Sequence, residues 1–337
     1  MDKESLANVA SAIVAPGKGI LAADESTPTM GKRLALINQE NTEANRRDFR
    51  QALFDTESME HFISGVILFE ETLEQKSEDG TRLSKILESK GVYPGIKVDK
   101  GAHPMDGSPS EKITKGLDGL YERCIDFYKL GARFAKWRAV ITIGEGIPTD
   151  KCIQSNASAL AKYAKACQDA NLVPIVEPEV LMDGDHNIQT CYEVSEKTLR
   201  TTFNELEKEG VYLPGILLKP NMVISGKECP VQADMNEVAQ MTVKCLMASV
   251  PKEVPGIVFL SGGQSETEAT EHLNAMNSMG EYPWKLSFSY GRALQQSALH
   301  SWAGDNANLG TTYATFYHRA EMNSKACHGE YSPELEI

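Results

Sequence analysis

Charged side chains recur in this sequence where short apolar, β-branched runs end. Within a run the charged positions lie two residues apart, which places both side chains on one face of a strand. The residues concerned are Asp24, Lys97, Asp99, Lys136, Arg138, Glu177, Glu179 and Lys219. Buried charges persist only when they are paired or used. A shared face of this kind can transfer protons and activate a nucleophile.

Lys219 is the candidate nucleophile of this set. An amine crowded by a second cation, as Lys219 would be by Lys136, loses its proton more readily and then attacks ketones. Glu177 comes from the intervening run and can shuttle the protons that carbinolamine dehydration and imine hydrolysis require. Two other interpretations stay open, namely that Lys219 binds a phosphate and that the whole set is a structural ion-pair network.

Two features near the end of the chain favour an anionic substrate. The turn Ser261-Gly-Gly-Gln264 leads into a helix that Ser265 and Glu268 open as a capping box. Its backbone, Gly262 and Gly263 included, offers N–H groups and a helix dipole to a phosphate. Arg292 lies at the end of the last apolar run, and the two loops fall where barrels commonly hold phosphate.

A second basic group follows the first apolar run. It consists of Lys32-Arg33 and Arg46-Arg47. These residues can hold the far end of a bisphosphate. A solvated helix face is the alternative, and for Arg47 we prefer it.

The apolar runs themselves predict the architecture. They are Gly19–Asp24, Phe62–Leu73, Tyr93–Lys100, Ala132–Val140, Val173–Leu181, Gly215–Val223, Gly256–Gly263 and Lys285–Ala293. Helical periodicity fills the intervals, and Gly91, Gly131 and Gly210 follow helical segments as C′ residues. We predict an α/β fold, a single (β/α)8 TIM barrel with parallel strands and surrounding helices, in one domain of residues 1–337 with a short C-terminal segment after about residue 326.

Composition excludes several partners. With 34 basic and 47 acidic residues the net charge is −13, which argues against bulk binding to nucleic acid or an anionic membrane. No run is long enough to span a membrane, and the residues from Met1 to Gly19 lack the basic start and long apolar core of a signal peptide, so we expect none there. Seven scattered cysteines without a C-x-x-C pair favour a reducing compartment, so we expect a cytoplasmic protein. The seven histidines show no paired ligand spacing, and no metal site is expected.

The charged runs lie within longer motifs. These are Ala15–Ser26, Gly95–Lys100, Phe134–Arg138, Val176–Glu179, Leu217–Asn221, Leu260–Ser265 and Phe288–Ala293. They resemble the motifs of class I (Schiff-base) fructose-bisphosphate aldolase, in the family's order, from about Val9 to Tyr331. The resemblance implies an aldehyde-lyase of glycolysis and gluconeogenesis. It would cleave fructose 1,6-bisphosphate reversibly to dihydroxyacetone phosphate and glyceraldehyde 3-phosphate, without metal or other cofactor.

The resemblance also implies roles for single residues. Lys219 would form the Schiff base, Glu177 would shuttle protons, Lys136 would assist carbinolamine formation, and Asp24 would act on the C4 hydroxyl. Glu179 and Lys97 would orient this network. The substrate would be bound by Arg138, by Ser261, Gly262, Gly263, Gly291 and Arg292 at the C1 phosphate, and by Ser26, Thr29, Arg33 and Arg46 near the C6 phosphate.

Other implied properties concern assembly and substrate choice. The family forms tetramers more often than dimers, so we expect a homo-oligomer. Animal members end in a flexible tail whose tyrosine tunes substrate preference, whereas the last tyrosine here is Tyr331. The choice between fructose 1,6-bisphosphate and fructose 1-phosphate therefore stays open. So do a transaldolase or deoxyribose-phosphate aldolase activity, a scaffold role, and a metal-dependent class II aldolase.

Overall fold

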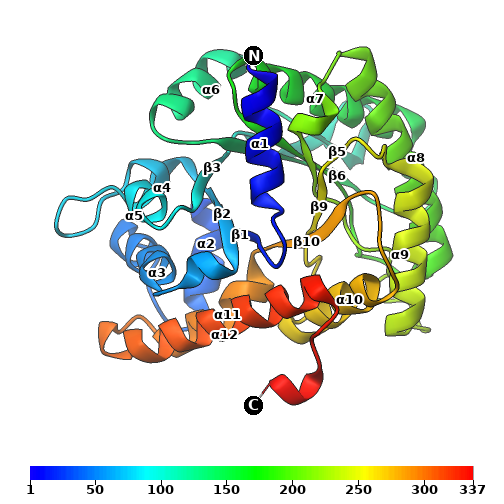
Figure 1. Ribbon diagram of the computed structural model, residues 1–337. Helices are drawn as coiled ribbons and strands as arrows, with labels where there is room; N and C mark the ends of the chain where they lie inside the picture. The colour runs from blue at the N-terminus through cyan, green and yellow to red at the C-terminus, as the bar shows by residue number, and fades with distance from the viewer. Residues whose placement is uncertain (337) are drawn as a thin grey trace.

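The computed structural model, which describes residues 1–336, is a closed barrel of eight parallel strands surrounded by helices (Figure 1). The barrel strands are β1 (Gly19–Ala23), β2 (Ile63–Leu68), β3 (Tyr93–Lys97), β6 (Phe134–Ile141), β7 (Val173–Val180), β8 (Leu217–Leu218), β9 (Gly256–Phe259) and β10 (Lys285–Tyr290). They follow one another around the barrel in chain order, and β10 closes it by pairing with β1. The predicted fold class is confirmed.

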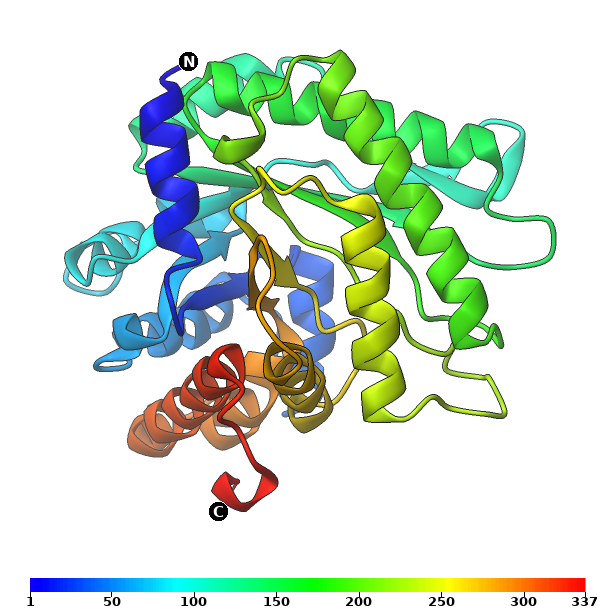
Figure 2. The same ribbon diagram turned by 45° about the vertical axis from the view of Figure 1, so that its right-hand side comes forward.

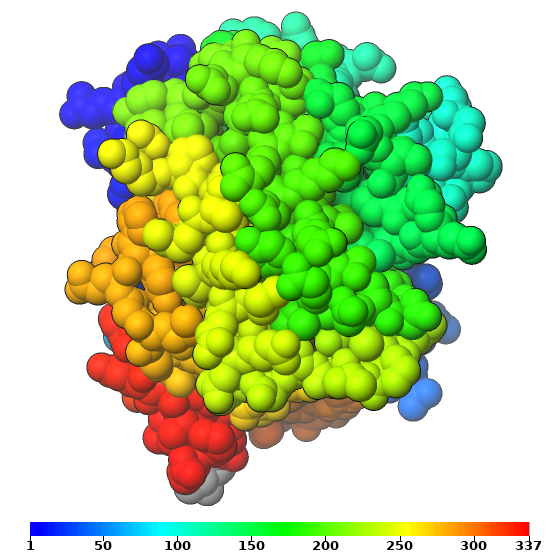
Figure 3. All heavy atoms as spheres, turned by 90° about the vertical axis from the view of Figure 1, so that its right-hand side faces the viewer, coloured from blue at the N-terminus to red at the C-terminus, as the bar shows by residue number. Residues whose placement is uncertain are grey.

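Helices connect most successive strands and surround the barrel. They are α1 (Lys3–Ile13), α2 (Thr27–Ala35), α3 (Glu43–Asp55), α4 (Glu70–Glu74), α5 (Leu83–Ser89), α6 (Leu120–Lys129), α7 (Asp150–Asp169), α8 (Ile188–Lys208), α9 (Met235–Ser249), α10 (Glu266–Ser278), α11 (Arg292–Trp302) and α12 (Leu309–His328). Helix α1 precedes the first strand, and α11 and α12 follow the last. The turned view shows α8 and α9 side by side outside the strands (Figure 2). On the face seen in Figure 3, the segments coloured green to yellow form a continuous surface.

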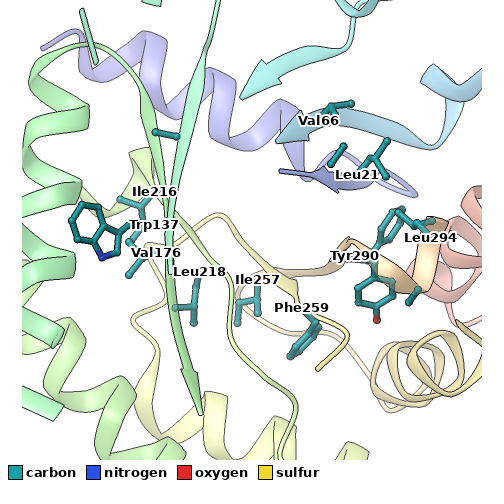
Figure 4. Close-up of a cluster of buried hydrophobic side chains, with 14 of the residues drawn as sticks. Leu21, Val66, Trp137, Val176, Ile216, Leu218, Ile257, Phe259, Tyr290 and Leu294 are labelled. Atoms are coloured by element: carbon teal, nitrogen blue, oxygen red, sulfur yellow. The ribbon is translucent and has the colours of Figure 1, made fainter. Parts of the chain in front are cut away.

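Alternate residues of the strands pack on opposite sides of the barrel wall. One set faces the helices, as Figure 4 shows for Val176 and Leu218 of neighbouring strands. The other set faces the interior, where Ile175 and Leu217 pack with residues of α1, which covers this end of the barrel. The interior positions that follow, Glu177 among them, are charged. Every second residue of a strand therefore faces the interior, and these residues are apolar at one end of the barrel and charged at the other.

One large aromatic ring helps to fill the floor of the barrel. The side chain of Phe134 is fully buried and lies over Gly95 of the neighbouring strand. A Cβ atom added at Gly95 would lie 2.2 Å from that ring. Glycine at this position therefore lets the aromatic ring close the interior beneath the polar mouth.

Several boundaries differ from the prediction. The second strand ends at Leu68, because the acidic residues from Glu70 onward begin α4, where a helix N-terminus favours them. The sixth strand is reduced to β8, since Pro220 has no N–H to continue the ladder, although Lys219 N still donates to Val176 O at 2.8 Å. Arg292 begins α11 instead of ending β10.

Other local predictions are confirmed. Gly91, Gly131 and Gly210 have positive φ after α5, α6 and α8, and Ser265 with Glu268 forms the capping box of α10. An antiparallel hairpin of β4 (Ala102–Met105) and β5 (Ser108–Thr114) was not predicted. Within residues 1–336, no helix combines the length and apolarity that a membrane crossing needs.

Candidate active site

A cavity of about 760 Å³ opens where the strands β1, β3, β6, β7 and β8 end. The structure brings fifteen of the sixteen predicted site residues to its lining: Asp24, Ser26, Thr29, Arg33, Lys97, Lys136, Arg138, Glu177, Glu179, Lys219, Ser261, Gly262, Gly263, Gly291 and Arg292. The remaining residue, Arg46, is not among those that line it. This end of the barrel is where enzymes of this architecture place their catalytic groups.

Two lysines and two carboxylates form the buried centre of the cavity. Lys219 Nζ lies 3.2 Å from Glu177 Oε1, and Lys136 Nζ lies 3.4 Å from Glu177 Oε2. Lys136 Nζ also contacts Asp24 Oδ2 at 2.7 Å. The side chains of Lys219, Lys136 and Glu177 are nearly inaccessible to solvent. Each oxygen of Glu177 therefore faces a different lysine.

The electrostatics of this centre keep Asp24 ionised. Burial alone would raise the pKa of Asp24, but the ammonium groups of Lys136 and Lys219 outweigh burial and lower it to about 2. Burial would likewise lower the pKa of Lys136, yet Asp24 and Glu177 outweigh it and raise the pKa above the usual lysine range. Lys136 thus remains a permanent cation beside Lys219.

Two further ion pairs surround the centre. Arg138 Nε pairs with Glu179 on the neighbouring strand β7. Lys97 Nζ contacts Asp99 Oδ1 at 2.6 Å, and the Arg138 amide donates to the other oxygen of Asp99 at 3.3 Å. These contacts fix the orientation of the side chains around the buried lysines.

One end of the cavity carries the predicted double-glycine turn. Gly262 and Gly263 both have positive φ, +44° and +76°, a conformation that side-chain-bearing residues rarely adopt. Arg292 Nη2 reaches the turn and donates to Gln264 O at 3.2 Å. Ser261 is buried in the same lining. A glycine backbone, a hydroxyl and a guanidinium thus line one part of the cavity, and such groups can bind an anion.

The second basic region is smaller than predicted. Ser26 and Thr29 lie at the start of α2, with their hydroxyl oxygens 3.0 Å apart, and Arg33 lies one turn further on. Arg33 is paired with Glu25, whose carboxylate also accepts from Gln295 at 3.0 Å.

Arg46 does not join this region. Its Nε and Nη2 atoms bind the two oxygens of Glu71 at 2.9 and 2.6 Å, and its Nη1 donates to Asn41 Oδ1 at 3.0 Å. A bidentate carboxylate pair of this geometry leaves little of the guanidinium for another anion. The expectation that Arg46 lies at a phosphate position is therefore not supported by its surroundings.

Residues that were not predicted also shape the cavity. Glu25 anchors Arg33, and Arg50, which is fully buried, donates to the backbone oxygen of Glu25 at 2.7 Å. Lys227 and Ser289 line the cavity too. Glu25 directly follows the predicted Asp24, so its neighbourhood was a usable signal. Lys227 lies in a loop outside every motif, and nothing in the sequence marks it.

In the described part of the chain, no three His, Cys, Asp or Glu side chains gather as a metal site would require. All seven cysteines are free. The chemistry that the cavity offers on its own residues is amine nucleophilicity, proton transfer by carboxylates and anion binding. Together the barrel and this cavity are typical of an enzyme that has a buried lysine and groups able to bind anions.

Comparisons with known proteins agree with this class. Residues 5–336 match the family model described as fructose-bisphosphate aldolase class-I. A relative from Xanthomonas campestris, a probable fructose-bisphosphate aldolase class 1, is 54% identical over 98% of this chain and 99% of its own length. The non-muscle type fructose-bisphosphate aldolase of Lethenteron camtschaticum is 52% identical over 98% of this chain and 92% of its own length. A structure of Plasmodium falciparum fructose-bisphosphate aldolase in complex with TRAP and an inhibitor has a TM-score of 0.97 at 51% identity, over 98% of this chain and 96% of that chain.

The chain therefore belongs to the class I fructose-bisphosphate aldolase family. Its activity is the reversible cleavage of fructose 1,6-bisphosphate to dihydroxyacetone phosphate and glyceraldehyde 3-phosphate, a step of glycolysis and gluconeogenesis. As a member of class I, it is a carbon–carbon lyase that works through a lysine Schiff base and without a metal.

Proposed function

We propose that Lys219 is the amine that forms the Schiff base and that Glu177 relays its protons. The 3.2 Å contact between Lys219 Nζ and Glu177 Oε1 carries this proposal. Glu177 can take the ammonium proton, which frees the amine to attack the C2 ketone. The protonated carboxyl then returns a proton to the carbinolamine hydroxyl, which leaves as water and yields the iminium.

The residues around Lys219 and Glu177 would assist carbinolamine formation and the later cleavage of the C3–C4 bond. Lys136, held as a cation, stabilises negative charge on the carbinolamine oxygen. Asp24 and Glu177 position the C4 hydroxyl and remove its proton. The electrons of the C3–C4 bond then move into the iminium, giving an enamine and the free aldehyde. Glu179 and Lys97 hold the network in place through their pairs with Arg138 and Asp99.

The two ends of the substrate would bind at the two anion regions. We assign the C1 phosphate to Ser261, Gly262, Gly263, Gly291 and Arg292. Ser26, Thr29 and Arg33 would hold the C6 phosphate, and Arg138 would contact the sugar between them. Arg46 is not part of this assignment, because Glu71 occupies it.

Borohydride trapping with dihydroxyacetone phosphate tests the nucleophile. We expect one reduced adduct, which peptide mass mapping places on Lys219. Lys136 and Lys97 lie in the same cavity and serve as internal controls. An adduct on either of them, or no adduct at all, would contradict the assignment of Lys219.

Arg33 and Arg46 offer a paired test of the far phosphate region. Arg33→Ala should raise KM for fructose 1,6-bisphosphate by about 10-fold or more, because a charge-assisted hydrogen bond to phosphate is lost. KM for fructose 1-phosphate, which lacks that group, should stay within about twofold. Arg46→Ala should leave both KM values near wild type and lower the thermal stability instead, since it breaks the pair with Glu71. Steady-state kinetics of both variants decide this, and a larger KM effect for Arg46→Ala would reverse the assignment.

Assembly, location and domain organisation extend the proposal. We propose a cytoplasmic homo-oligomer, and we favour a tetramer over a dimer. The enzyme would use no cofactor, because the lysine of the chain itself forms the covalent bond to the substrate. The free cysteines support a reducing location. We also propose one barrel domain with a short C-terminal segment. That segment follows α12, which reaches His328, and it contains Tyr331, whose hydroxyl donates to Glu336 Oε1 at 3.0 Å.

A further inference from the structure

We propose that Lys227 is an additional ligand for the phosphate at the Ser261–Gly263 turn, and that it favours a doubly charged phosphate there. The inference rests on the proposed function of the cavity, because it assigns one more contact to the C1 phosphate. Lys227 comes from the loop after β8, and it lines the same cavity as the turn.

The backbone around Lys227 is held firmly in place. The amides of residues 226–228 donate to carbonyl oxygens of the 182–186 loop at 2.8–2.9 Å. The two segments approach so closely that a Cβ atom at Gly226 would lie 2.3 Å from Gly184 O. Only glycine permits this contact without a shift of the backbone. The Cα of Lys227 is thus fixed at the edge of the cavity.

The side chain of Lys227 extends over the turn. A Cβ atom added at Gly263 would lie 3.1 Å from Lys227 Cε and 1.6 Å from Met182 Cε, so both side chains lie beside the turn. The ammonium group itself has only a distant carboxylate near it, since Nζ lies 3.7 Å from Asp183 Oδ1 and both side chains are more than half exposed. Exposed pairs of this length contribute little free energy. The cation is therefore free to exchange Asp183 for a phosphate.

A phosphate bound at the Ser261–Gly263 turn would carry more negative charge than one cationic side chain can balance. Gly262 and Gly263 line the cavity with their backbone, because both have positive φ and neither carries a side chain. Within residues 1–336, neither N–H donates a hydrogen bond to another group of the chain. Arg292 contributes one positive charge to this turn. A phosphate monoester carries nearly two negative charges at pH 7, and Lys227 can balance the second.

Direct binding measurements test the proposal. In the Arg33→Ala background, which removes the far cationic group, the added change Lys227→Ala should weaken binding of inorganic phosphate by about 5- to 10-fold in calorimetry. Lys227→Arg should restore most of the affinity. Lys252 is an exposed lysine outside the cavity, so Lys252→Ala is the matched control and should bind as its parent does.

Two carbonyl ligands separate the phosphate contact from the amine chemistry. Lys227→Ala should reduce borohydride trapping of dihydroxyacetone phosphate at subsaturating concentration by a similar factor. Trapping of dihydroxyacetone, which has no phosphate, should not change. Unaltered phosphate affinity in Lys227→Ala would overturn the role of Lys227, even with a normal adduct on Lys219. Conversely, a missing adduct together with weakened phosphate binding would overturn the proposed function and leave Lys227 as a phosphate ligand.

Discussion

Replacement of Lys219 by alanine should lower the rate of fructose 1,6-bisphosphate cleavage by about 10⁴-fold or more. The loss is this large because a covalent nucleophile and its relay act as a unit, so removing one member removes nearly the whole contribution. The variant should also fail to form any borohydride adduct with dihydroxyacetone phosphate. Turnover at saturating substrate and intact-mass analysis after reduction measure the two effects.

Lys219→Arg is the matched control for charge. Alanine leaves Glu177 with one ammonium contact in place of two, so part of its effect on stability is electrostatic. Arginine keeps a positive charge beside Glu177 but forms no imine. Both variants should be inactive, while Lys219→Arg should retain more of the thermal stability of the wild type. Activity in Lys219→Arg within about 10-fold of wild type would show that this residue acts as a cation only.

The fold could be predicted because the alternation of charged and apolar residues along each strand shows which side chains face the barrel interior. Glu177 and Glu179 on one strand, and Lys136 and Arg138 on its neighbour, alternate with apolar residues that pack against the helices. Charge at every second position of a buried strand has few explanations other than a lined cavity. The strand ends were less predictable. They depend on local chemistry, such as the missing N–H of Pro220, which ends the ladder after β8.

Most residues that line the cavity could be predicted from sequence motifs, on strands and in loops alike, whereas contacts between distant segments could not. Arg46 looked equivalent to Arg33 in sequence, since both are basic residues on helices after the first strand. Whether such a residue faces substrate depends on which carboxylate reaches it, and Glu71 of α4 reaches Arg46. Lys227 shows the opposite case. It lies beside the Ser261–Gly263 turn because the 182–186 loop holds its backbone there.

Replacement of Glu177 by glutamine should lower kcat by about 10²- to 10⁴-fold, the range expected when a proton relay is removed. The amide is nearly the same size as the carboxyl, so it can remain between Lys219 and Lys136, but it cannot carry a proton from one step to the next. Formation of the iminium should slow, whereas its position on Lys219 should not change. Quenching with borohydride at short times measures that rate directly.

The matched controls separate proton transfer from burial. Glu177→Asp keeps a carboxyl and should retain clearly more activity than Glu177→Gln. Glu111 is an equally buried carboxylate outside the cavity, where it accepts from Thr149 N at 2.6 Å. Glu111→Gln should therefore lower stability and leave kcat within about twofold. If Glu177→Gln kept kcat within 10-fold of wild type, the relay would have to pass through Asp24, the other carboxylate in contact with Lys136.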